Sequence, residues 1–445
     1  MQSIKEHINL TLKLAYPVMI GQLGWVMMGV VDTMMVGGLG PTPLAAASVS
    51  NGIFILILVL GLGVSYAVTP LIAIAIGAGK NEECEIIFKQ SIIINLLLGI
   101  VLMATTFYLA GIIKFLNQPD EVVRQSISYT RILGYSIIPI MLFQTHKQFI
   151  EGLSETRPAM VITIIANIIN AAVNWLLVYG NYGFPKLGLE GSGWATFSSR
   201  LFMAVIMFLY VKKSKKFKQF DVTFRVRKLN FSYIKKILGL GVPSAFQYFF
   251  EVGSFSFAVI MIGWLGTVQL AAHQIAINLA SITYMATLGI SSAGAIRVGN
   301  ALGKQDVNEV RRAGFTAIIL GASIMAVCGL IFITLRDFLP SLYIHDNNVI
   351  SIASTLLIIA GMFEIFDGAQ AVGIGVLRGL TDVKWPTLIT FISYWLIALP
   401  VGYFFGFILK MQVTGVWIGF LVGLASSAIL LTLRFNKKSK RLTLF

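Results

Sequence analysis

The feature that most constrains this chain is a series of apolar stretches that recurs along its whole length. Each stretch has about 20 residues or more, which is enough to cross the ~30 Å hydrocarbon core of a bilayer as an α-helix. Only 12% of the 445 residues are charged and 57% are hydrophobic, whereas a soluble domain carries about 25% charged residues. Most of the surface must therefore face lipid, and we expect an all-α polytopic membrane protein.

The apolar stretches predict twelve transmembrane helices, with one long polar segment between the sixth and the seventh. The first six helices are expected near residues 9–37, 45–77, 85–116, 124–152, 158–181 and 187–213. The second six are expected near residues 233–262, 270–302, 306–337, 348–377, 384–408 and 413–434. The polar segment suggests an N-terminal lobe of residues 1–213, a basic linker of residues 214–232 and a C-terminal lobe of residues 233–445.

Positive charge is distributed unevenly among the predicted loops. A net charge of +15 could suggest a nucleic-acid partner, but most Lys and Arg residues fall on the side that holds both termini and the linker. This is the positive-inside pattern, so we expect both termini in the cytoplasm of a bacterial cell and no nucleic-acid partner. The linker could also contact anionic lipid. The opposite side holds Lys114, Arg124, Arg131, Lys186, Arg336 and Lys410.

Several functional classes lack their sequence signatures. The two cysteines, Cys84 and Cys328, suggest no disulfide framework, zinc site or redox pair. The chain has no Gly-rich phosphate loop of the Walker type and no acid–base arrangement that suggests a membrane enzyme. Its first apolar stretch is too long for a signal peptide and reads as a retained helix. We therefore expect neither an enzyme nor a cofactor.

The two halves of the sequence resemble each other. Residues 39–46 (LGPTPLAA) align with residues 265–272 (LGTVQLAA) at an offset of 226, and the same offset pairs Pro17 with Pro243. Six helices, an even number, separate the copies, so the repeats have the same orientation in the membrane. Parallel repeats of this kind are an architecture of secondary transporters, which place the substrate site between two lobes.

Four acidic residues lie well inside predicted helices: Asp32, Glu251, Glu364 and Asp367. A charge near the bilayer centre costs at least about 2.5–3.5 kcal/mol, so such residues are candidates for function. The alternative is a buried carboxyl group that only hydrogen-bonds its neighbours, and it stays open most of all for Glu364. Arg200 also lies inside a predicted helix, where it could be an internal counter-ion or could extend toward the interface.

Asp32 has plausible companions in its own half. Asn167, Asn170 and Asn174 share one face of the fifth helix, and Thr196 adds a hydroxyl group from the sixth. Carboxylate, amide and hydroxyl oxygens without thiol or imidazole suit a hard cation. We predict a cation site, with Na+ at Asp32, Asn170 and Asn174 and with Thr196 beside them. The alternative is that these amides only join helices.

The acids of the second half lie among polar and aromatic side chains. Glu251 and Asp367 are the predicted cation- and drug-binding residues, because carboxylates beside aromatic rings can hold an amphipathic organic cation. Either acid could exchange a proton for that cation. The rings could equally be apolar filler, and a lone histidine is more often packed than functional. The residues predicted to line a substrate site are Gln247, Tyr248, His273, Asn278, Phe363 and Glu364.

These residues and their neighbours resemble the multidrug and toxic compound extrusion (MATE) family, and its NorM-type branch in particular. The resemblance implies a V-shaped transporter of two six-helix lobes that exports cationic drugs against inward Na+ or H+. We expect a monomer that binds small organic cations within the lipid bilayer. The motifs that carry the resemblance are VDTMMVG at 31–37, PLAA at 43–46, LAAHQIA at 270–276, RVG at 297–299 and GVLRG at 375–379.

The resemblance also implies residue roles. In similar proteins, positions that match Asp32, Asn170, Asn174 and Thr196 form a cation site, and acids that match Glu251 and Asp367 are linked to cation and drug binding. This chain departs from the NorM branch at Phe363, where that branch often has tyrosine. A flippase of lipid-linked precursors is the nearest alternative, but it would need several basic residues in its cavity, and Arg200 is the one candidate here. An intramembrane enzyme or a channel fits less well.

Overall fold

The computed structural model describes residues 4–116, 118–220 and 229–442. This part of the chain is helical and contains no β-strand. Twelve of its helical segments are long and apolar enough to span a membrane, which confirms the predicted fold class and number of spans. Three basic residues of the predicted linker, Arg225, Arg227 and Lys228, lie outside the described residues.

The first half of the chain contains α1 (Ile4–Gly37), α2 (Pro41–Ser65), α3 (Val68–Gly77), α4 (Asn81–Ile112), α5 (Asp120–Tyr135), α6 (Ile137–Gly152), α7 (Arg157–Tyr179) and α8 (Leu189–Lys213). The second half contains α9 (Phe231–Gly263), α10 (Thr267–Gly303), α11 (Val307–Thr334), α12 (Phe338–Ser341), α13 (Asn347–Gly379), α14 (Lys384–Phe391), α15 (Leu399–Tyr403) and α16 (Gln412–Lys440). Three short 3-10 turns are η1 (Ile113–Phe115), η2 (Asn181–Gly183) and η3 (Lys215–Phe217). Most predicted ends agree within a few residues, and α16 continues to Lys440.

Two spans that the sequence predicted as continuous helices are broken. The second span divides into α2 and α3, and the fourth divides into α5 and α6 at Ser136. There the backbone N–H and the hydroxyl group of Ser136 both donate to the Leu133 carbonyl, at 3.0 and 2.6 Å. A serine hydroxyl group that bonds a carbonyl of the preceding turn competes with the helical pattern, and Pro139, in the first turn of α6, has no N–H to donate. The corresponding spans of the second half, α10 and α13, are continuous.

The eleventh span also departs from a regular α-helix. Two π-helical segments, η4 (Ile392–Ala398) and η5 (Phe404–Ile408), lie on either side of α15. Pro400 is the second residue of this short helix and has no N–H to donate to the preceding turn. Wider π turns inside a helix often occur at functional sites.

The described chain forms two compact units. The first unit is Ile20–Ala245, and the second unit is Met1–Met19 together with Phe246–Phe445. The boundaries fall inside α1 and α9, so each of these helices contributes to both units. The division into two lobes at the linker stays a prediction.

Close helix packing explains these shared helices. A methyl group at Gly289 of α10 would lie 2.8 Å from the carbonyl oxygen of Ala15 in α1. A methyl group at Gly63 of α2 would lie 2.3 Å from the Cα atom of Ala245 in α9. Glycine at these two positions permits the backbones to approach, as small residues do between membrane helices.

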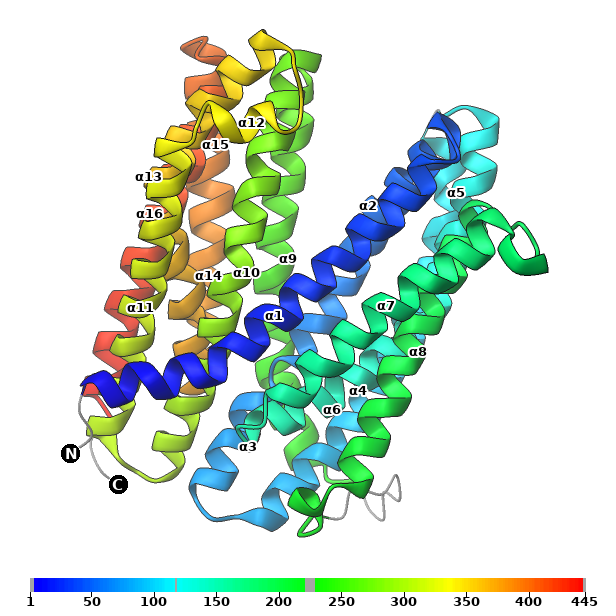
Figure 1. Ribbon diagram of the computed structural model, residues 1–445. Helices are drawn as coiled ribbons and strands as arrows, with labels where there is room; N and C mark the ends of the chain where they lie inside the picture. Colours follow the sequence, from blue (N-terminus) through cyan, green and yellow to red (C-terminus); the bar gives the residue numbers. More distant parts are fainter. Residues whose placement is uncertain (1–3, 117, 221–228, 443–445) are drawn as a thin grey trace. The chain divides into compact units, whose positions relative to one another are not determined.

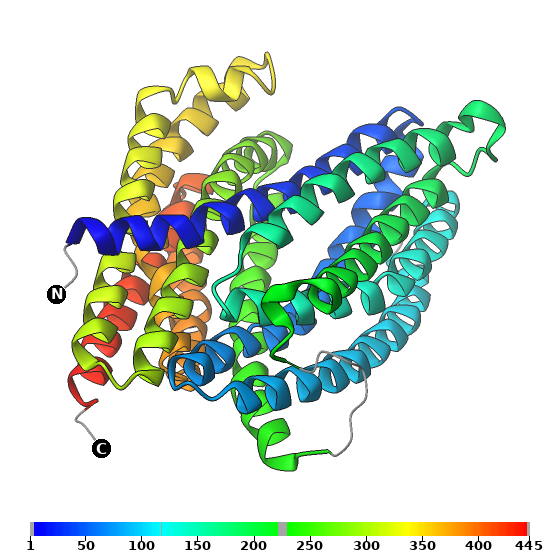
Figure 2. The ribbon, with the colours of Figure 1, turned by 60° about the horizontal axis from the view of Figure 1, so that its bottom comes forward.

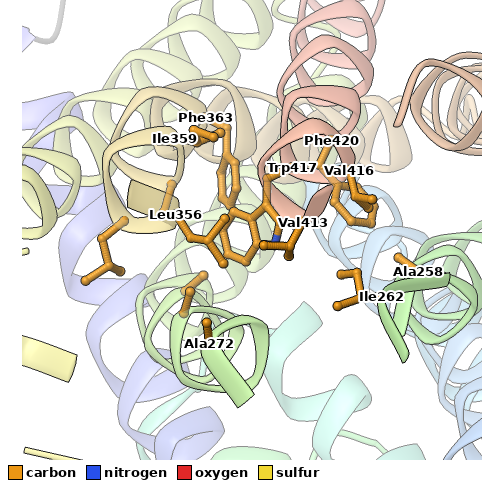
Figure 3. Packing of buried hydrophobic residues seen from close by; sticks show 14 of the residues in the cluster. Ala258, Ile262, Ala272, Leu356, Ile359, Phe363, Val413, Val416, Trp417 and Phe420 are labelled. Atoms are coloured by element: carbon orange, nitrogen blue, oxygen red, sulfur yellow. The ribbon is translucent and has the colours of Figure 1, made fainter. Parts of the chain in front are cut away.

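Each unit has its own helix packing. In the second unit, α13 packs against α10, α11 and α16 (Figure 1). In the first unit, α7 packs along α8, and α6 packs against α4 and α8 (Figure 2). The apolar core of the second unit includes Trp417, which is 1% exposed and lies beside Leu356, Phe363 and Val413 (Figure 3).

Candidate functional site

In the first unit, three neutral side chains donate hydrogen bonds to the carboxylate of Asp32. Asn170 and Asn174 reach Oδ1 through their Nδ2 atoms at 3.1 and 2.6 Å. The hydroxyl group of Thr196 reaches Oδ2 at 2.9 Å. The two amides lie one turn apart on α7, and Thr196 lies on the adjacent α8. The structure thus brings together the four residues predicted for the N-lobe site, while their role as cation ligands stays a prediction.

The chemistry of this cluster is compatible with a small hard cation. Asn170 and Asn174 are fully buried, and Thr196 is nearly so. The side-chain oxygen of Asn174 makes no hydrogen bond within the described chain. An amide side chain carries an acceptor and a donor on one planar group, so rotation can present either atom to the carboxylate site. The same residues could hold Asp32 through N–H groups and offer oxygens to a cation.

Asn167 does not join this cluster. Its Nδ2 atom donates to the backbone carbonyls of Gly24 at 2.8 Å and Thr163 at 2.9 Å. The amide therefore links α1 to α7, as in the alternative considered for the whole row of asparagines. The sequence spacing alone could not separate Asn167 from the two asparagines that contact Asp32.

Arg200 is buried inside the first unit, so it does not extend toward the membrane interface. Its Nη1 atom donates to the hydroxyl group of Ser136 at 2.6 Å. Its guanidinium carbon lies 5.3 Å from the ring centre of Trp25 and 5.0 Å from that of Phe54. Of its two predicted roles, only that of an internal charge fits this position.

In the second unit, Glu251 is the centre of a buried polar network. Its Oε1 atom accepts a hydrogen bond from the Tyr284 hydroxyl group at 2.8 Å. Its Oε2 atom accepts a longer one from Gln247 at 3.4 Å. Gln370 of α13 lies near Glu251 and accepts a hydrogen bond from the Tyr394 hydroxyl group at 3.0 Å. Four elements, α9, α10, α13 and η4, therefore meet at one carboxyl group.

Several members of this network were not predicted as site residues. Tyr284, Gln370 and Tyr394 are neutral polar residues inside apolar spans, which is a weaker signal than an acid in the same place. Arg378 was assigned to the cytoplasmic side, yet its Nη2 atom lies 3.4 Å from the side-chain oxygen of Gln247. Arg200 is therefore not the only basic side chain near a candidate site.

Two further acids lie near Glu251. Asp367 is half-buried, interacts electrostatically with Glu251 and makes no hydrogen bond in the described chain. Glu364 is fully buried, and its Oε1 atom accepts from Thr283 at 3.0 Å, while its Oε2 atom has no hydrogen-bond partner among the described residues. Three carboxyl groups share these surroundings with one arginine, so bound protons or cations must balance much of their charge.

The other predicted lining residues have different surroundings. His273 is buried and accepts a hydrogen bond at Nδ1 from the Trp417 indole at 3.0 Å. Phe363 stacks against Trp417, with ring centres 5.5 Å apart (Figure 3). Tyr248 is half-buried and Asn278 is exposed. A role for these residues in lining a substrate site stays a prediction.

The described residues offer no site suited to a transition metal. They contain no group of three or more His, Cys, Asp or Glu side chains that could hold a metal ion. Both cysteines, Cys84 and Cys328, are free thiols. The Asp32 site and the group of acids around Glu251 are the candidate sites, and their ligand types suit alkali cations, protons and organic cations.

A family comparison detects the same internal repeat. The MatE family model matches residues 17–176 and again residues 243–404. The two matches begin at Pro17 and Pro243, the pair that the self-alignment placed at an offset of 226. The predicted repeat is therefore confirmed.

Curated relatives cover nearly the full length of the chain. The multidrug resistance protein NorM of Vibrio vulnificus (strain YJ016) is 35% identical over 442 residues, 98% of this chain and 96% of that protein. The multidrug resistance protein MdtK of Yersinia pseudotuberculosis is 34% identical over 439 residues, with coverage of 98% and 96%.

A solved structure supports the fold. A multidrug resistance MATE family transporter of the MOP superfamily, described in an outward-facing conformation, matches with a TM-score of 0.91 and 20% identity over 99% of this chain and 97% of that one. With two matches to one family model and relatives above 30% identity over nearly its whole length, this chain belongs to the MatE family and to the NorM-type branch of MATE transporters.

Proposed function

We propose that this protein is a multidrug exporter that moves small amphipathic compounds, mostly cations, out of the cell in exchange for inward Na+ or H+. The observation that carries the proposal is the Asp32 site. An acid inside a membrane-spanning helix is held by three neutral donors, and no basic side chain of the described chain pairs with it within 4.0 Å. Such a carboxylate is costly to maintain without a cation, so its presence argues for cation binding.

The Asp32 cluster and the Glu251–Asp367 cluster have different roles in this proposal. The Asp32 cluster binds the driving cation, and the Glu251–Asp367 cluster binds the organic cation together with protons or Na+. A bound ion can shift a conformational equilibrium only through a difference in affinity between the two states. Coupling therefore requires that the cation at Asp32 binds one state of the transporter more tightly than the other.

Competition at the second cluster supplies a direct route to exchange. Phe250 precedes Glu251 on α9 and packs against Phe391 with ring centres 4.9 Å apart. An organic cation can interact with such rings and with a carboxylate at the same time. Because the drug and a small cation would neutralise the same carboxylates, the arrival of one favours the release of the other.

We assign Na+ to the Asp32 site by preference, because its amide, hydroxyl and carboxylate oxygens suit a hard alkali cation. The test is efflux of a cationic dye from proteoliposomes with Na+ and pH gradients imposed separately. We expect the inward Na+ gradient to drive efflux. Absence of efflux under both gradients, with protein confirmed in the membrane, would overturn the proposed function.

The flippase alternative has no observation in its favour. A pyrophosphate-linked lipid needs several basic side chains, whereas Arg200 and Arg378 both lie close to acid clusters. The same proteoliposomes can carry a labelled lipid-linked saccharide, and we expect no protein-dependent flipping of it.

The orientation is part of the proposal. Both termini and the linker face the cytoplasm, because basic residues gather on that side. Single cysteines at Thr42, Thr267 and Asp346, in a cysteine-free background, should react with an impermeant thiol reagent added to intact cells. Labelling of these positions only after lysis would reverse the orientation.

A further inference from the structure

We propose that Arg200 is the internal counter-ion of Asp32, a tethered cation that competes with the transported cation for this carboxylate. The inference rests on the proposed coupling role of Asp32 and assigns the residue that responds when the cation leaves.

The surroundings of Arg200 are unusual for a buried charge. The side chain is 7% exposed, and its guanidinium group lies close to the rings of both Trp25 and Phe54. Ser136 is its one hydrogen-bond acceptor in the described chain, and its Nε atom is buried without a partner. A guanidinium group carries five N–H donors. A buried cation with so few partners is costly unless an opposite charge lies nearby.

Asp32 is that opposite charge. The two groups interact electrostatically, yet they do not form an ion pair within 4.0 Å. Arg200 follows Thr196 by four residues on α8, so both side chains extend from the same face of this helix. Thr196 already donates to Asp32 at 2.9 Å. Asp32 therefore has two sets of partners within reach, the neutral donors that now hold it and the guanidinium group.

This arrangement connects cation binding to a break in the backbone. A cation at Asp32 repels Arg200 toward Ser136, and departure of the cation lets the guanidinium group approach the carboxylate. Ser136 is the residue at which α5 and α6 separate, and its hydroxyl group also donates to the Leu133 carbonyl. Exchange of the two cations keeps the charge of Asp32 balanced in both states and changes the hydrogen bonding at this break.

The test measures Na+ binding by the purified full-length protein in detergent. Thermal unfolding is followed as Na+ replaces choline at constant ionic strength, because a ligand that binds only the folded protein raises its stability with concentration. We expect Arg200→Met to lower the half-saturating Na+ concentration by about five- to fiftyfold, since one repelling charge at short range is removed. Arg200→Lys retains the charge and should stay near the wild type.

Two further variants distinguish an effect of the Arg200 charge on Na+ binding from a general effect of losing a buried arginine. Ser136→Ala removes the acceptor that holds Arg200 away from Asp32, so it should raise the half-saturating Na+ concentration, which is the opposite sign. Arg311→Met is the matched control. Arg311 lies in the second unit, stacks over Phe315 at 5.4 Å and donates to Ser439 at 2.9 Å. Its loss should leave Na+ binding unchanged.

Each outcome decides the inference. A folded Arg200→Met protein with unchanged or weaker Na+ binding overturns it, as does a Ser136→Ala protein with tighter binding. Wild-type protein that binds Na+ through Asp32 without driving dye efflux would refute the proposed function and leave the role of Arg200 intact. If Na+ does not change the stability of the wild type, the free energies of unfolding of Asp32→Asn, Arg200→Met and the double variant are compared instead. If the loss in the double variant equals the sum of the two single losses, the inference is overturned. If it differs from that sum, the two side chains interact and the inference is supported.

Discussion

Asp32 in the first unit has three neutral donors and no second acid beside it, whereas Glu251 in the second unit shares its surroundings with Glu364 and Asp367. A single carboxyl group with close, fixed donors can be complementary to one small ion. A group of acids joined by tyrosine and glutamine side chains can balance different numbers of positive charges. The first arrangement favours selectivity, and the second favours tolerance of different cargo.

The internal repeat shows whether the acids of the two units occupy corresponding positions. At the offset of 226, Asp32 corresponds to Ala258, a fully buried residue in the apolar core of the second unit. In the reverse direction, Glu251 corresponds to Trp25, whose ring lies 5.3 Å from Arg200. The halves share a helical framework, but neither acid has an acidic counterpart. The framework was therefore repeated, and each half carries its own chemistry.

The largest effect that tests this comparison is expected at Asp32. Asp32→Asn keeps the size of the side chain and removes its charge, which should weaken cation binding by more than about tenfold. Gradient-driven dye efflux from proteoliposomes should fall to the background. Gel filtration and membrane yield serve as controls for folding. Normal efflux by a normally expressed variant would remove Asp32 from the coupling mechanism.

A smaller effect is expected at the Glu251–Asp367 cluster. Glu251→Gln or Asp367→Asn should weaken binding of a cationic dye by about five- to tenfold, since one charge of several is lost. Protons compete with the dye for these acids, so wild-type binding should weaken as pH falls, and the variants should show a flatter profile. A neutral analogue should change by less than about twofold. Variants that keep the wild-type affinity and pH profile would make these acids structural.

The asparagines of α7 offer a matched pair within one helix face. Asn170→Ala removes a donor to Asp32 and should weaken Na+ binding, at a cost of about 1–2 kcal/mol. Asn167→Ala removes the bond to the Gly24 carbonyl and should lower thermal stability without changing Na+ binding. Titration of thermal stability with Na+ measures both. Equal effects of the two substitutions on Na+ binding would mean that the whole row only joins helices.

Much of the fold could be predicted because its signals are local. Apolar length and loop charge are properties of short windows, and they placed all twelve spans within a few residues at most ends. The break at Ser136 has a local signal that apolar length alone does not use, because Gly134 and Pro139 flank it and Pro139 has no N–H to donate to the preceding turn. The bonds that the Ser136 hydroxyl group makes there, to the Leu133 carbonyl and from Arg200 of another helix, could not be read from the sequence. Contacts over long sequence distances are outside what periodicity can detect.

In both candidate sites, contacts among residues on one helix face could be predicted, whereas contacts between distant helices could not. Helical spacing was enough to place Asn170 and Asn174 on one face, and both contact Asp32. Tyr284, which donates to Glu251, and Gln370, which lies near it, come from two other helices. The position of a polar residue in a long apolar span does not indicate which neighbour it contacts. Acids could be singled out because their insertion costs most, whereas neutral partners carry a weaker signal.

The smallest functional effect is expected at Phe363, the departure from the NorM branch. Its ring is 4% exposed and stacks on Trp417 in the apolar core, so it does not occupy the position of a cation ligand (Figure 3). Hydroxyl groups reach the acids from elsewhere, since Tyr284 donates to Glu251. Phe363→Tyr should therefore leave the Na+ dependence of dye binding unchanged. It should lower the free energy of unfolding by about 1–3 kcal/mol, because the new hydroxyl group is buried without a partner. Dye binding at several Na+ concentrations and thermal unfolding measure the two effects. A gain in Na+ affinity would mean that residue 363 turns toward the acids, and the second cluster would then bind a small ion as selectively as the first.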